Sequence, residues 1–93
     1  MILPQDYTKL NSTKRRKVRE EYVKVQKGKC CYCGESLDKN PCSSVRNKPI
    51  TKAFFPRGFF NYPIHLHHNH DTGLTIGAIH CYCNAVSWEY DGE

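Results

Sequence analysis

The sequence predicts a small α+β domain that depends on a staple as well as on a hydrophobic core. The chain has 93 residues, the length of one domain. A domain of that size buries only roughly 60–65% of its unfolded surface. Hydrophobic residues make up 39% of the chain, and its mean hydropathy is -0.68. Six cysteines and five histidines are therefore expected to supply the staple, as a metal site or as disulfides.

The first element is expected to be a basic helix over about 13–27. Ser12 or Thr13 can cap its start, and Gly28 stands where a glycine commonly ends a helix. Three apolar residues recur on one face at helical spacing: Val18, Tyr22 and Val25. The lead-in before this helix is expected to be irregular.

Positive charge is concentrated in and around this helix. Residues 1–29 hold nine Lys/Arg and three Asp/Glu, a net charge of +6, whereas residues 30–93 carry -1. A basic arm joined to a near-neutral half favours a polyanionic partner. The residues expected to contact nucleic acid are Lys14, Arg15, Arg16, Lys17 and Arg19. An ordinary solvated helix face is the alternative.

Residues 35–63 are interrupted by four prolines, so no long element is predicted there. Four phenylalanines are expected to fill a core that is otherwise short of apolar residues: Phe54, Phe55, Phe59 and Phe60. Basic residues interleave with them, namely Arg46, Lys48, Lys52 and Arg57, and their role stays open between DNA contact and solvation.

Two short strands are predicted at Ile64–Asn69 and Leu74–Ile79, joined by a turn at Asp71–Gly73. Neighbouring side chains of a regular strand face opposite ways. His67 and His68 can therefore enter one pocket only if the strand ends or bulges there. A short helix is predicted to follow, over Asn84–Tyr90, so that a strand, strand and helix core spans about 64–91 within a single domain, 1–93.

Two pairs of potential metal ligands echo each other at 30–33 (C-C-Y-C) and 80–83 (H-C-Y-C). Each pair has a C-x-x-C or H-x-x-C spacing, and zinc takes four such ligands in a tetrahedron. The predicted structural Zn²⁺ ligands are Cys30, Cys33, His80 and Cys83. Cys81 in place of His80 would give an all-cysteine site, and reduced thiols without metal are the remaining alternative. Cys42 is expected to be free.

The chain shows no apolar leader and no apolar run near the roughly 20 residues that span a membrane. We therefore expect a cytoplasmic protein with no membrane partner. Such a compartment is reducing, which favours metal over disulfides. A disulfide-stapled secreted peptide is accordingly the least favoured interpretation.

The chain carries L-H-H-N-H-D-T-G at 66–73, Gly77 and C-N at 83–84, with an earlier G-K-C-C-Y-C-G at 28–34. In these segments it resembles the HNH, or ββα-metal, nucleases. The branch that it resembles most is the phage recombination endonuclease VII type. The resemblance does not cover 38–63. It implies a small zinc-stapled ββα-metal (HNH) domain acting on DNA, in the host cytoplasm if the gene is carried by a phage.

The resemblance implies that His68 is a general base and that His67 and Asn84 hold one catalytic divalent cation. Phosphodiester hydrolysis needs a deprotonated water and a cation to offset developing charge. An acid is usual at the position of His67, so histidine there favours Mn²⁺, Ni²⁺ or Zn²⁺ over Mg²⁺. With an ordinary histidine pKa of about 6.5, activity is expected to fall below about pH 6. A monomer would nick DNA, and a homodimer could cut both strands.

Two further histidines receive structural predictions. His65 is expected to be a surface or packing residue, and His70 a structural hydrogen-bonding residue. The rival to the nuclease hypothesis is a non-catalytic zinc module that binds nucleic acid through the basic helix. It would need the four zinc ligands but would have no use for His67 and His68.

Overall fold

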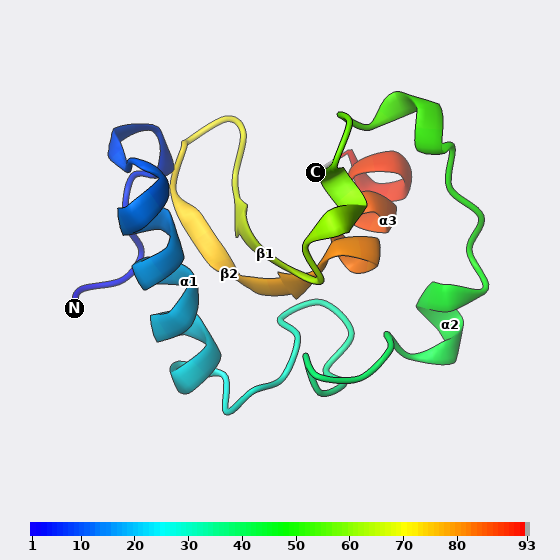
Figure 1. Cartoon of the computed structure of the whole chain (residues 1–93), viewed down its shortest axis with the longest axis horizontal. Coiled ribbons are helices and arrows are strands. Elements are labelled where there is room, and N and C mark those ends of the chain that lie inside the picture. The colour runs from blue at the N-terminus through cyan, green and yellow to red at the C-terminus, as the bar shows by residue number, and fades with distance from the viewer. Residues whose placement is uncertain (93) are drawn as a thin grey trace.

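The computed structural model describes residues 1–92 and has the predicted α+β architecture, a two-stranded antiparallel hairpin flanked by helices (Figure 1). Helix α1 (Ser12–Val25) and helix α3 (Cys81–Asp91) each pack on both strands, and Figure 1 shows them on opposite sides of the hairpin. Minor elements are α2 (Ser43–Arg46) and the 3-10 turns η1 (Tyr7–Lys9), η2 (Lys52–Phe54) and η3 (Phe59–Asn61). Within residues 1–92, no helix is long and apolar enough to cross a bilayer.

Helix α1 is capped by Asn11, so the prediction of Ser12 or Thr13 as the cap is wrong. The Asn11 side chain accepts a hydrogen bond from the Lys14 N–H at 2.9 Å. The helix ends at Val25, two residues before the predicted end at 27, because Lys27 already has a φ of 56° in the left-handed region.

The buried face of α1 carries Val18 and Tyr22 as predicted, but Val25 is 64% exposed. Residues four apart share a helix face, and the stripe continues to Gln26. The Gln26 side-chain amide donates to the Ala78 carbonyl at 2.9 Å and accepts from the Ala78 N–H at 2.8 Å. A polar side chain thus takes the place expected for Val25 and pairs with the edge of the second strand.

The hairpin joins β1 (Ile64–His68) to β2 (Thr75–His80), within one residue of the predicted strand ends. The register shifts between His67, which pairs with Gly77, and His68, which pairs with Thr75. This irregularity lies where the sequence required the strand to end or bulge. The predicted turn is present, with Gly73 at a φ of 77° and Asn69 Oδ1 accepting two turn N–H groups.

The N-terminal lead-in has no regular element apart from the 3-10 turn η1, as predicted, but it pairs with the start of β2. The Thr75 N–H donates to the Gln5 carbonyl at 2.8 Å, and the Tyr7 N–H donates to the Gly73 carbonyl at 2.8 Å. Tyr22 of α1 reaches the same point, with its hydroxyl 2.8 Å from Thr75 Oγ1. These bonds fix Tyr7 beside the end of β1.

Helix α3 begins at Cys81, three residues before the predicted Asn84. We call the ligand segments 30–33 and 80–83 the first and second knuckle. His80 is the N-cap residue of α3, so the second knuckle itself forms the first helical turn. Gly92, at a φ of 77°, ends the helix. Residues three apart lie on one helix face, and the knuckle therefore presents His80 and Cys83 together.

The hydrophobic core lies between α1, the hairpin and α3 and includes Val18, Leu66, Ile79, Cys83 and Val86. The prediction that the four phenylalanines fill this core is wrong. Phe54 is 62% exposed, and the four rings form a separate aromatic cluster with Trp88 of α3. The proline-rich segment carries them along the outside of α3 (Figure 1), where the Thr51 N–H donates to the Glu89 carboxylate at 3.0 Å.

Candidate metal cluster and active-site cavity

Four side chains converge beneath the hairpin in a cluster that could hold a metal ion. The ligand atoms of Cys30, Cys33, His80 and Cys83 all lie within 4.8 Å of one another. His80 Nδ1 is 3.5 Å from the Cys33 sulfur and 3.6 Å from the Cys83 sulfur. Ligands at about 2.0–2.3 Å from a tetrahedral zinc lie roughly 3.5–3.8 Å apart. The donor set and its spacing therefore fit a structural zinc ion.

The ring of His80 is fixed in the orientation that a metal needs. Its Nε2–H donates to the backbone carbonyls of Ser36 at 2.9 Å and Lys39 at 2.8 Å. With the proton held on Nε2, the lone pair of Nδ1 points at the three sulfurs. Metal-bound histidines commonly donate their other N–H to a carbonyl in this way.

The thiols of the cluster are arranged to lose their protons to a cation. Hydrogen bonding from Cys83 lowers the pKa of Cys30 to about 4, and the same contact raises the pKa of Cys83. The two thiols thus interact within the cluster, and a divalent ion that binds there would displace their protons. Cys81 lies outside the cluster, and burial raises the pKa of its thiol. The ligand set is therefore the one with His80 and not the all-cysteine alternative.

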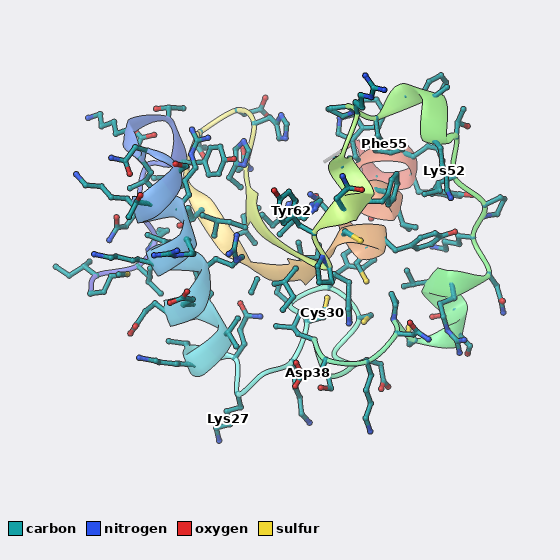
Figure 2. All side chains as sticks on the ribbon, in the orientation of Figure 1. Lys27, Cys30, Asp38, Lys52, Phe55 and Tyr62 are labelled. Atoms are coloured by element: carbon teal, nitrogen blue, oxygen red, sulfur yellow. The ribbon has the colours of Figure 1, made fainter. Side chains whose placement is uncertain are left out.

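The first knuckle is held against β2 by backbone contacts. The Cys31 N–H donates to the Ala78 carbonyl at 3.0 Å, and the Tyr32 and His80 N–H groups point at Cys30 Sγ. Figure 2 shows Cys30 on the loop that runs below the hairpin, with other sulfur atoms near it. No disulfide is present among the described residues, and Cys42 is free as expected.

A second site lies on the other side of the hairpin, in a cavity of about 590 Å³. Strand β1 lines it with His65, His67 and His68, and α3 with Asn84. The cavity thus brings together the three residues predicted for catalysis and metal binding. His67 is only 7% exposed. Among residues 1–92, the cluster of Cys30, Cys33, His80 and Cys83 is the only group of three or more His, Cys, Asp or Glu that could hold a metal ion, and it lies outside the cavity.

His68 is held by ring stacking. Its ring lies 3.7 Å from that of Tyr7, at an interplanar angle of 6°, and 4.7 Å from that of His70. The Arg15 guanidinium covers the other face of Tyr7 at 3.9 Å. His70 therefore stacks rather than acting through the hydrogen bond predicted for it. The stack fixes the plane of the His68 ring and leaves its edge toward the cavity.

The pKa of His68 is lowered, first by burial and then by the nearby positive charges of His70, His67 and Arg15. Both causes disfavour the protonated imidazolium. His68 is consequently neutral at neutral pH, the form that accepts a proton from water.

His65 bonds directly to Asn84, a role that the sequence did not reveal. The His65 Nε2–H donates to the Phe59 carbonyl at 2.8 Å, and the Asn84 side-chain amide donates to His65 Nδ1 at 3.1 Å. Burial is the main cause that lowers the pKa of His65, which keeps Nδ1 an acceptor. This hydrogen bond engages the amide nitrogen of Asn84 rather than its oxygen. The packing role predicted for His65 is thus joined by a positioning role.

The predicted basic cluster is divided between two places. Arg15 and Arg19 line the cavity, whereas Lys14, Arg16 and Lys17 are exposed outside it. Arg16 also lies 3.8 Å from the Glu20 carboxylate, an exposed pair that contributes little to stability. The helix spacing of Arg15 and Arg19 could have indicated this division, because residues four apart share a face.

The chain matches no protein-family model, no curated protein and no solved structure. The argument for a function therefore rests on the residues of the cluster and the cavity and on how they are arranged.

Proposed function

We propose that this protein is a metal-dependent DNA endonuclease of the HNH type, built on a structural zinc. The observation that carries the proposal is the cavity itself. It gathers a neutral histidine, His68, two candidate ligands, His67 and Asn84, and two arginines in one place. Each of the three parts of phosphodiester hydrolysis, a base, a cation and a phosphate clamp, has a residue suited to it.

His68 is proposed as the general base. Its ring is fixed by Tyr7 and His70, and its lowered pKa keeps it neutral. A neutral imidazole within reach of a bound water can take its proton as the water attacks phosphorus. Arg15 and Arg19 would hold the phosphate by charge-assisted hydrogen bonds.

His67 and Asn84 would hold one divalent cation, which when bound supplies charge neutralisation at the phosphate and the leaving oxygen. One nitrogen and one amide oxygen form a softer pair than the carboxylates that Mg²⁺ prefers. The pair suits Mn²⁺, Ni²⁺ or Zn²⁺ better. The His65 contact orients Asn84 toward this role.

A non-catalytic zinc module that binds nucleic acid is the second candidate. The observation that favours it is the position of Lys14, Arg16 and Lys17, which are exposed and do not line the cavity. Such residues can bind phosphates without any chemistry. In that case, substitutions of the exposed helix residues would weaken DNA binding, whereas substitutions in the cavity would leave DNA binding unchanged.

Nicking of supercoiled plasmid tests the proposal. Zinc-loaded protein is incubated with Mg²⁺, Mn²⁺, Ni²⁺ or EDTA, and wild type is compared with His68→Ala. We expect conversion to open circles with Mn²⁺ or Ni²⁺, and a loss of roughly 10²–10⁴-fold in the variant, as is typical of removing a general base.

Lys17→Ala is the matched control, since Lys17 is basic but exposed outside the cavity. It should bind DNA more weakly and still nick at saturating protein. Equal nicking by His68→Ala, or no nicking with any of the metals, would sink the nuclease proposal. If no metal supports nicking but the protein still binds DNA, the non-catalytic zinc module is favoured.

A further inference from the structure

An aromatic surface lines the candidate cavity, and the proposed chemistry makes no use of it. We define the aromatic wall as the cavity-lining rings of residues 54–62 and α3, namely Phe54, Phe55, Phe59, Tyr62 and Trp88. Figure 2 shows Phe55 on the segment beside α3 and Tyr62 between that segment and the hairpin. Helix α1, which brings the two arginines, lies on the other side of the hairpin in Figure 1.

Three rings of the wall are held exposed. Phe54 is 62%, Tyr62 70% and Trp88 44% accessible to solvent. Exposed apolar patches of this kind mark binding sites more often than scattered single residues do. The wall is also supported from behind. Phe55 packs on Trp88 with ring centroids 5.4 Å apart and on Phe59 at 4.9 Å, so the Trp88 ring is held in place before anything binds.

The wall adjoins the candidate metal ligands. Trp88 lies four residues after Asn84 on α3, on the same face and about 6 Å further along the axis. Phe59 accepts the hydrogen bond that holds His65 against Asn84. A group stacked on the wall would therefore sit next to a phosphate at His68 and Asn84.

The charges around the wall indicate what kind of molecule it fits. Arg15 and Arg19 line the same cavity, and Lys52 Nζ lies 5.7 Å above the Phe60 ring. Flat apolar rings interleaved with cations complement a strand of nucleic acid, which offers flat bases and phosphates in alternation. A paired base in a duplex keeps both faces stacked on its neighbours, whereas an unpaired base can place a face on a protein ring.

We propose that the aromatic wall binds an unpaired nucleobase of single-stranded DNA beside the scissile phosphate. This inference rests on the proposed nuclease function for the position of that phosphate. It names the preferred substrate as DNA that is single-stranded or locally unpaired.

Fluorescence anisotropy tests the inference with a labelled mixed-sequence oligonucleotide, alone and annealed to its complement. Zinc-loaded protein is used with no other divalent cation, so that binding is measured without cleavage. We expect the single strand to bind more tightly than the duplex. Phe54→Ala and Trp88→Ala should weaken single-strand binding by roughly 5–150-fold, the range found when a stacking ring is removed, and leave duplex binding unchanged. Trp88→Phe, which keeps a stacking ring, should retain most of the affinity.

Tyr90→Ala is the matched control, because Tyr90 is 46% exposed on the same helix but does not line the cavity. Zinc content and melting temperature establish that each variant folds, and Phe54→Ala decides the outcome if Trp88→Ala does not fold. Equal affinity for the two DNA forms, or unchanged single-strand binding in Phe54→Ala, would overturn the inference. So would a wild-type dimer that Phe54→Ala dissociates, since the wall would then be an interface between copies.

The two proposals fail in different ways. Plasmid nicking without a single-strand preference would remove the stacking site and leave the nuclease. A single-strand preference that depends on Phe54, without nicking by any metal, would leave the stacking site and remove the nuclease.

Discussion

His80 and His68 stand at opposite ends of one hairpin and are held in opposite ways. Both ring nitrogens of His80 are engaged, Nε2 by two carbonyls and Nδ1 by the sulfurs of the cluster. His68 is gripped by its faces, between Tyr7 and His70, and within residues 1–92 neither of its nitrogens makes a hydrogen bond to the protein. The first arrangement suits a metal ligand, whereas the second leaves both ring nitrogens available for the proton transfer proposed for His68.

The metal cluster around His80 and the cavity around His68 differ in how many of their polar groups are engaged by the protein. The metal cluster is closed, with four protein ligands and Cys30 and Cys83 buried. The cavity is open and offers two candidate ligands beside charged and aromatic side chains. Four ligands leave no position for a reacting water, but two leave several. We therefore expect the cluster to stabilise the fold and the cavity to carry the proposed chemistry, and the predictions below test that division.

Removing a zinc ligand should have the largest effect. Cys33→Ser is expected to lose the metal and unfold the domain, because zinc binding in small domains contributes about 10–16 kcal/mol, against a net stability of about 5–15 kcal/mol. Metal analysis and circular dichroism measure both losses. Cys81→Ser and Cys42→Ser serve as controls that keep one zinc per chain. A Cys33→Ser protein that is folded without metal would remove the structural role of the cluster.

His65→Ala should impair the cavity while leaving the cluster intact. Without the Nδ1 acceptor, Asn84 is no longer oriented, and loss of such a supporting contact typically costs 10–100-fold in metal affinity or activity. The readout is the Mn²⁺ concentration that gives half-maximal plasmid nicking, which should rise. His65→Asn, whose Oδ1 replaces the Nδ1 acceptor, should recover part of the loss. An unchanged Mn²⁺ requirement in His65→Ala would show that Asn84 needs no such support.

Gly77→Ala should damage the cluster side of the hairpin. An added Cβ would lie 2.6 Å from the Gln26 side-chain oxygen and 3.0 Å from Cys31 Cβ. Overpacking of this kind costs about 1–3 kcal/mol, and denaturant unfolding of the zinc-loaded protein measures it. Ile76→Ala is the matched control, since the neighbouring Ile76 is 44% exposed on the same strand. Equal stability of the two variants would mean that the knuckle does not depend on close approach to β2.

The sequence predicted the cluster better than the cavity, and the reason is physical. Ligands at x-x spacing are brought together by one turn of chain, so local spacing identifies each of the two segments that supply them. The choice between His80 and Cys81 needed the phase of α3, whose start was predicted three residues late. The contacts of Tyr7 with His68 and of His65 with Asn84 join residues far apart in the sequence, and no local pattern encodes them. The four phenylalanines were misplaced because apolar composition alone does not distinguish a core from an exposed cluster.

The smallest expected effect concerns the pH below which the nicking rate falls. This acidic limit tests the role proposed for His68. The base works only when neutral, and burial with nearby positive charge lowers the pKa of His68. The rate should therefore persist below pH 6.5, the ordinary histidine value, and fall only as pH passes the lowered pKa.

His70→Ala should move this limit upward. The substitution removes a neighbouring positive charge and exposes the His68 ring, and both changes raise the pKa of His68 toward its ordinary value. The measurement is kcat/KM for nicking from about pH 5 to 8, which reports ionisation of the free enzyme. The zinc content of the variant should not change, because His70 is not one of the four residues of the cluster. If the acidic limit stays fixed or moves to lower pH in His70→Ala, His68 is not the group whose protonation stops the reaction.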